Sequence, residues 1–201
     1  MMRVVNFSSG IIFYLKIGYQ KRACVMDLNN LLKQNKDAIV KKWLILIFET
    51  YPSDTAKFLK RQKDPFANPV GNTLSVNLGP LFDELLNEMD YETITSYLYP
   101  ILRIRAVQPI LSSSQSTGFI FLLKKVIKES FKKELSDKNI LNELLYFETK
   151  IDELTLIVFD VYLKCREKVY EIKANEERNR TFRAFERAGL LTEILADGPG
   201  L

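Results

Sequence analysis

Apolar residues recur at three- and four-residue steps along most of this chain, which is the spacing of one face of an α-helix. Between Leu28 and Phe48 the pattern predicts a first helix. It ends before Pro52, because the residue preceding a proline avoids helical backbone angles, and a short second helix follows through Leu59. No segment alternates apolar and polar residues between turn signals, so we expect an all-α fold without strands.

The middle of the chain is divided by prolines and capping residues. Asn68 as an N-cap, with Pro69 at the first helical position, predicts a helix over residues 69–89. Residues 90–104 follow as one kinked helix or two short ones, because Pro100 interrupts the pattern.

A capping box opens the next element. Ser112 and Gln115 have the three-residue spacing in which a hydroxyl and an amide side chain each satisfy a backbone N–H at a helix start. The run from 118 to 135 then predicts one amphipathic helix whose apolar side faces the core.

The last predicted helix is long for a chain of this size, with Ser136 as its N-cap. Its distal half, residues 165–180, is charged enough to leave the body and pair with a second copy, which predicts a homodimer. A shorter amphipathic tail occupies residues 181–201. The apolar seam of the long helix extends for about eight turns and comprises Leu144, Phe147, Ile151, Leu154, Val158, Tyr162, Cys165, Val169 and Ile172.

The length and composition indicate one globular domain, since 201 residues with 47% hydrophobic and 27% charged side chains can bury a substantial core. We place this domain at residues 26–180. The net charge of +4 arises in residues 1–25, which contain four basic residues and no acidic one, so the remainder is neutral. Nucleic-acid binding is not expected, because it relies on a concentrated basic surface.

Residues 1–25 are interpreted as a disordered extension or an overcalled start, with an interfacial membrane contact as the alternative. Stable membrane insertion is not expected, because Lys16 ends an apolar piece that begins at Gly10, far short of the roughly 20 residues that span a bilayer. Met26 then resembles a natural start directly before an amphipathic helix.

Cysteine and histidine usage excludes several kinds of chemistry. Cys24 and Cys165 are the two cysteines of the sequence, too few for a disulfide framework, and a reducing cytoplasm is the expected location. The sequence has no histidine, which excludes Ser-His-Asp catalysis, histidine-ligated zinc and histidine-ligated haem. We therefore expect no catalytic residues, no metal site and no cofactor.

Five polar residues in apolar surroundings are candidates for a polar network or a ligand site. Arg103, Arg105 and Gln108 lie just before a proline, and partly buried arginines require partners. Asp160 interrupts an apolar run, and Asp152 precedes it by eight residues on nearly the same helical face. We interpret Asp160 as the structural partner of Arg103 or Arg105, with an anionic ligand as the alternative.

The segment from 63 to 71 is a second candidate, a possible phosphate-binding loop, since Lys63, Asp64, Asn68 and Gly71 occur together in it. It lacks the glycine and lysine spacing of known phosphate-binding loops. Termination of one helix and initiation of the next is therefore the preferred interpretation.

Six sequence blocks in the same order resemble the RsbRD N-terminal domain family, over about residues 26–180. They are KW at 42–43, ETYP at 49–52, FLKRQKDPFANPVG at 58–71, RIRAVQ at 103–108, SQSTGFIFLLKKVI at 114–127 and FDVYLKCREKVYE at 159–171.

This resemblance implies a non-catalytic sensory or regulatory input domain of the stressosome type, as also found before some sensor histidine kinases. Related input domains are globin-like dimers without haem, and stand-alone versions occur in sulfur-metabolising anaerobes. Nothing after Arg180 is long enough for an output domain, so we expect the signal to pass to an unknown partner protein.

Two other classes of function remain open at this point. One is a small-ligand-binding or redox-accessory protein of an electron-transfer complex in sulfur metabolism, with Arg103, Arg105 and Asp160 lining a pocket. The other is an enzyme that uses carboxylates or a tyrosine, which the missing acid–base and metal residues disfavour.

Overall fold

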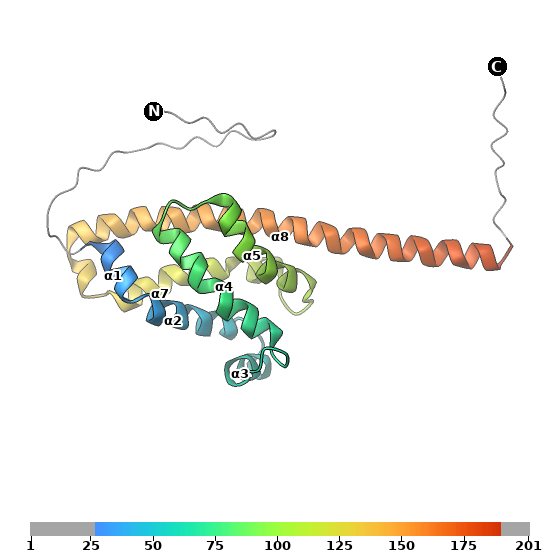
Figure 1. Ribbon diagram of the computed structural model, residues 1–201, viewed down its shortest axis with the longest axis horizontal. Coiled ribbons are helices and arrows are strands. Elements are labelled where there is room, and N and C mark those ends of the chain that lie inside the picture. The colour runs from blue at the N-terminus through green and yellow to red at the C-terminus, as the bar shows by residue number, and fades with distance from the viewer. Residues whose placement is uncertain (1–26, 190–201) are drawn as a thin grey trace, which may run out of the picture.

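Residues 27–189 are described by the computed structural model, and within that range the chain forms helices and turns without any strand (Figure 1). The predicted all-α helical bundle with a long C-terminal helix is thus confirmed. The interpretation of residues 1–25 and the end of the predicted tail, from residue 190 on, lie outside the described residues.

The first predicted helix is wrong as a single element, because it divides at Asn35 into α1 (Leu28–Gln34) and α2 (Lys36–Glu49). The Asn35 side chain donates through Nδ2 to the carbonyl oxygen of Leu31 at 2.9 Å. Asparagine side chains compete in this way with the helical backbone, so a continuous apolar pattern does not guarantee a continuous helix.

Three further helices follow the predicted order: α3 (Ser53–Arg61), α4 (Pro69–Leu86) and α5 (Tyr91–Val107). Asn68 caps α4 as expected, by accepting from the backbone N–H of Gly71 at 2.8 Å. Residues 91–107 form one helix that continues past Pro100.

The α4 helix ends three residues before the predicted boundary, and Lys150 of the last helix, α8 (Lys138–Arg187), holds this end. Its Nζ donates to the carbonyl oxygens of Leu85 at 2.8 Å and Asn87 at 2.6 Å. A lysine at this position compensates the partial negative charge of the helix C-terminus.

The capping box of Ser112 and Gln115 is confirmed, but the helix predicted over 118–135 is wrong. The chain instead forms α6 (Ser113–Thr117), the 3₁₀ turn η1 (Gly118–Phe121), α7 (Leu122–Ser130) and the short turn η2 (Glu134–Ser136). The indole Nε1 of Trp43 donates to the carbonyl oxygen of Phe119 at 2.9 Å. This hydrogen bond from a distant residue is thus made to a segment that adopts 3₁₀ instead of α-helical geometry.

Helix α8 (Lys138–Arg187) has 50 residues, about 75 Å at 1.5 Å per residue. Its N-cap is Asp137, which accepts from the N–H of Asn139, and not Ser136 as predicted, because Ser136 ends the preceding 3₁₀ turn. The helix continues without a break past residue 180. Figure 1 shows its proximal half packed on the bundle and its distal part projecting beyond it.

The core lies between α8 and the other helices, and Trp43, Phe82 and Phe119 are among its fully buried side chains. The predicted seam of α8 is buried from Leu144 to Cys165 and then ends, because Ile172 is exposed. We call residues 166–187 the rod. No helix within residues 27–189 combines the length and apolar character that a membrane crossing requires.

Candidate functional site

The most polar feature of the core is a buried arginine held by backbone carbonyls. Arg105 is 1% exposed, and its Nε donates to the carbonyl oxygen of Ser116 at 3.1 Å while Nη2 donates to that of Gln115 at 2.7 Å. Its Nη1 donates to the hydroxyl of Tyr51 at 3.1 Å, and that hydroxyl donates to Oε1 of Gln108 at 3.1 Å. We call these five residues the Arg105 clamp; they connect the turn after α2 with the end of α5 and with α6.

The clamp contains a buried cation without a carboxylate. Two aromatic rings provide further stabilisation, since the guanidinium carbon lies 5.4 Å from the centroid of Tyr51 and 5.0 Å from that of Phe119. Burial lowers the pKa of Arg105 below its usual value, partly opposed by the nearby Tyr51. Burial likewise raises the pKa of the Tyr51 hydroxyl, against the opposing influence of Arg105.

The predicted pairing of Asp160 with Arg103 or Arg105 is wrong. Asp160 is exposed on α8, because it follows the buried Val158 by two residues, or about 200° of helical rotation. Arg103 is exposed as well, since it lies two residues before Arg105 on α5. Their helical positions therefore turn these two side chains away from the clamp.

Asp152 also lies outside the clamp and has a structural partner of its own. Its Oδ1 is 2.7 Å from Nζ of Lys124, which links α8 to α7 across the surface. Of the five candidate polar residues, the structure brings together Arg105 and Gln108, through Tyr51.

The 63–71 loop is held from within by Asn68, in agreement with the predicted helix punctuation. The Nδ2 of this buried side chain donates to the carbonyl oxygens of Leu59 at 3.2 Å and Gln62 at 2.9 Å. A Cβ on Gly71 would overlap the Asn68 side chain, so a glycine is required beside this cap. Lys63 is exposed, and Asp64 accepts the N–H of Phe66 at 3.0 Å.

A crevice beside the clamp is too narrow to admit a water molecule. Tyr51, Thr73 and Arg105 contribute the polar part of its lining, and the rest is aliphatic. Among the described residues there is also no cluster of three or more acidic or cysteine side chains able to hold a metal ion. The clamp therefore holds helices together, and each nitrogen of the Arg105 guanidinium already donates to a group of the protein.

A second apolar seam, which sequence reasoning missed, lies on the exposed side of α8. Leu156 is 68% exposed, and the others are also exposed, at spacings close to whole numbers of 3.6-residue turns. The seam lies about 140° of helical rotation from the buried one. We call it the outer seam; it consists of Leu145, Leu156, Phe159, Leu163, Tyr170 and Phe185.

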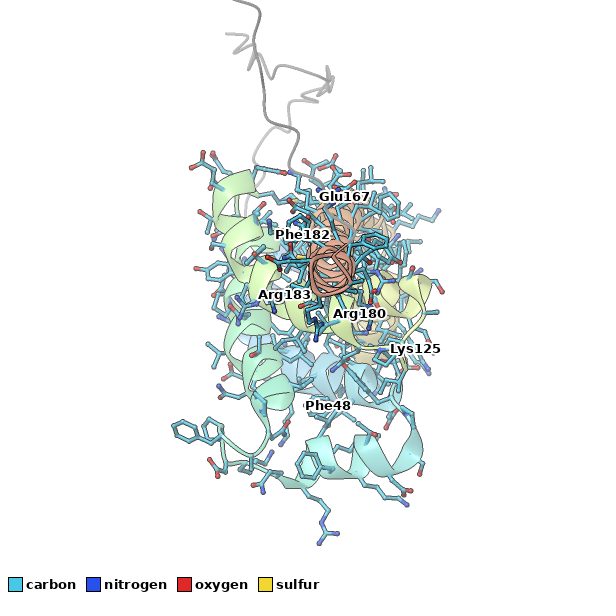
Figure 2. The ribbon with its side chains drawn as sticks, turned by 90° about the vertical axis from the view of Figure 1, so that its right-hand side faces the viewer. Phe48, Lys125, Glu167, Arg180, Phe182 and Arg183 are labelled. Carbon is cyan, nitrogen blue, oxygen red and sulfur yellow. The ribbon has the colours of Figure 1, made fainter. Side chains whose placement is uncertain are left out.

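The outer seam continues from the body into the rod, which Figure 2 shows nearly end-on, with Arg180, Phe182 and Arg183 pointing outward around the helix. Arg166 fixes the base of the rod, because its Nη1 donates to the carbonyl oxygen of Ala106 at the end of α5 at 2.7 Å. This hydrogen bond therefore attaches the first residue of the rod to the end of α5.

Two signals could have identified these features from the sequence. The outer seam places large apolar residues close to whole numbers of 3.6-residue turns, with steps of three and four between Leu156 and Leu163, alongside the buried seam, so α8 contains two apolar sets. Tyr51 directly precedes Pro52 at the end of a helix, where a large side chain is free to turn into the core. The carbonyl partners of Arg105 have no such signal, because every residue has a carbonyl.

Comparison with protein-family models matches residues 37–176 to the family described as RsbT co-antagonist protein rsbRD N-terminal domain. This range includes the whole Arg105 clamp and most of the outer seam. Comparisons with curated proteins and with solved structures find no match. The globin-like topology therefore stays a prediction.

Proposed function

The chain belongs to the RsbT co-antagonist protein rsbRD N-terminal domain family, and from this membership we propose that it is a sensory or regulatory input module. It acts in the cytoplasm through protein–protein contacts and has no catalytic activity of its own. The buried polar side chains of Arg105 and Asn68 support this proposal, since their donors already hold helices and loops together and thus have a structural role.

The outer seam of α8 carries this proposal. Six large apolar side chains lie exposed along one side of a helix, where they remain in contact with water unless another surface covers them. A second copy of the chain presents the same seam, so two copies related by a twofold axis cover both at once. We therefore propose a homodimer joined along α8.

The size of this surface suits a stable dimer. From Leu145 to Phe185 the seam extends for about 60 Å at 1.5 Å per residue, and a helix with its side chains is about 10 Å wide. A contact of that length is of the order of the ~800 Å² per partner that specific interfaces bury. In a parallel dimer the two rods lie side by side and present one output surface to the partner protein.

The test is the stoichiometry of the purified full chain with and without a charge on the seam. Leu156→Glu places a carboxylate at the most exposed apolar position of the seam, and we expect native mass spectrometry and sedimentation to change from dimer to monomer. Asn175→Glu is the matched control, because it adds the same charge at an exposed rod position off the seam and should leave the dimer intact.

A wild-type chain that stays monomeric at high micromolar concentration contradicts the proposed dimer. The native mass spectrum also tests the mode of action, because a small molecule retained in defined stoichiometry would favour ligand binding over protein contacts alone.

A further inference from the structure

One aromatic side chain is almost fully exposed to solvent and is not part of the hydrophobic core. Phe66 lies in the turn between α3 and α4 and is 97% exposed. Its ring therefore contributes almost nothing to the hydrophobic core, whereas a buried phenylalanine stabilises a fold by the apolar area that it removes from water. Another residue type would serve the turn equally well in the isolated fold.

The backbone around Phe66 is nevertheless firmly held. The N–H of Phe66 donates to Oδ1 of Asp64, and the N–H of Asp64 donates to Oε1 of Gln62, each at 3.0 Å. The N–H of Asn68 donates to the carbonyl oxygen of Asp64 at 2.9 Å. Asn68 itself is fixed to α3 and α4 through its side chain. The loop thus presents its ring in a pre-organised position, which reduces the entropy lost when such a side chain binds.

The surroundings of Phe66 carry unpaired positive charge. Arg61 and Lys63 form no ion pair with another residue of the described range, whereas nearby Lys57 pairs with Asp54 at 3.3 Å. Asp64 uses its carboxylate to fix the turn. Arg61 also borders a shallow surface depression next to the half-exposed ring of Phe58.

This surface lies on the side of the bundle away from α8. In Figure 1, α3 and the turn that follows it form the lower edge and α8 lies along the upper edge; in Figure 2, viewed at right angles, α3 is again at the bottom and α8 is seen nearly end-on in the upper half. A partner bound here would leave the outer seam and the rod free.

We propose that residues 61–66 form a docking loop that inserts the Phe66 ring into an apolar pocket of a partner protein, and that carboxylates at the rim of this pocket pair with Arg61 and Lys63. The combination of an isolated aromatic anchor, a rigid loop and flanking cations is typical of an interface centre with a charged rim. This inference deepens the proposed function by naming a partner surface, and it does not depend on the dimer along α8.

The first experiment places a photo-crosslinking phenylalanine analogue at position 66 of the full chain, expressed in its native host. The matched control carries the same analogue at Tyr146, which is also exposed, at 66%, but lies on α8. We expect one discrete adduct from position 66 that position 146 does not give, with the crosslinked residue of the partner next to carboxylates.

The second experiment measures binding of the identified partner in purified form. Phe66→Ala should weaken binding at least tenfold, and Arg61→Gln combined with Lys63→Gln should weaken it and reduce its salt dependence. Phe66→Ala should leave the melting temperature and the oligomeric state unchanged, which distinguishes a failure of this proposal from a failure of the α8 dimer.

Several results would overturn the docking loop. They are the absence of a position-specific adduct, an adduct within a second copy of the chain, an adduct with lipid, and undiminished partner binding by Phe66→Ala. A lower melting temperature of Phe66→Ala would also contradict it, because it would assign the ring a role in folding.

Discussion

At the scale of single residues, Arg105 shows how a buried charge is accommodated without an ion pair. Its guanidinium has carbonyl oxygens, a phenolic oxygen and two ring faces around it in place of a carboxylate. Transfer of a cation into a low-dielectric core is costly unless its donors are satisfied, so the clamp depends on all of these partners. The sequence indicated that Arg105 needs partners, but not that backbone atoms supply them.

Replacement of Arg105 by alanine should destabilise the fold by about 3–5 kcal/mol, because it leaves a cavity and exposes carbonyls and a hydroxyl that have lost their donors. Arg103→Ala, two residues earlier on the same helix but exposed, should change stability by less than about 0.5 kcal/mol. Urea unfolding followed by circular dichroism measures both. Equal effects of the two substitutions would contradict a structural clamp.

Tyr51 makes stability depend on pH in the alkaline range. Because burial raises the pKa of its hydroxyl above 10.0, the folded chain keeps a proton that the unfolded chain has already lost. The free energy of unfolding should therefore fall as the pH rises from about 10 through the pKa of the folded state, by up to about 1.4 kcal/mol per pH unit.

In Tyr51→Phe this contribution is absent, so a shallower decline above pH 10 is expected in denaturant titrations at successive pH values. The substitution also removes an acceptor of Arg105, so its stability near neutral pH should be lower than that of the wild type. Parallel curves for both chains would show that Tyr51 does not titrate as inferred.

At the scale of helices, the sequence predicted the elements better than their interruptions. Asn68 with Pro69 located the start of α4 because its N-cap and first-turn chemistry is local. The break at Asn35 and the 3₁₀ turn at 118–121 were missed, because the apolar pattern continues through both. The 3₁₀ turn has a hydrogen-bond partner, Trp43, that comes from a distant part of the chain.

Two glycines of α4 provide an internal comparison. Gly71→Ala should destabilise the fold by about 1–3 kcal/mol, because the new methyl group displaces the Asn68 cap and leaves buried carbonyls without donors. Gly79→Ala has open space around its Cβ, but the gain in helix propensity is opposed by Pro80, whose ring restricts a preceding residue that carries a Cβ, so stability should change by less than about 0.5 kcal/mol. Thermal unfolding should therefore show a clear decrease for Gly71→Ala and little change for Gly79→Ala, and a stabilised Gly71→Ala would show that the cap is dispensable.

At the scale of the whole molecule, the order of the rod should depend on the proposed homodimer. A single helix of 22 residues without tertiary contacts is marginal in water, and no described residue covers the rod beyond its base. The sequence predicted that this segment leaves the body. It assigned the pairing surface to the charged distal half alone, whereas four of the six outer-seam side chains, Leu145, Leu156, Phe159 and Leu163, lie on the proximal part.

Hydrogen–deuterium exchange of the full chain at low and high micromolar concentration should show this dependence. Amides of residues 173–187 should exchange rapidly in the monomer and become protected as the dimer forms, while those around Trp43 stay protected throughout. If the protection of the rod did not vary with concentration, the rod would be ordered independently of dimerisation, and the prediction would be wrong.

Because α8 is unbroken, the direction in which side chains point at the tip of the rod is fixed relative to the body. Each residue turns the helix by about 100°, so one residue inserted at the base of the rod would rotate Phe182 and Phe185 by that angle relative to the body. An insertion of seven residues, close to two full turns, would restore their azimuth and only lengthen the arm. A signal that twists the base of α8 would accordingly reach its tip as a rotation, and the surface offered there would change without any change in the fold of the body.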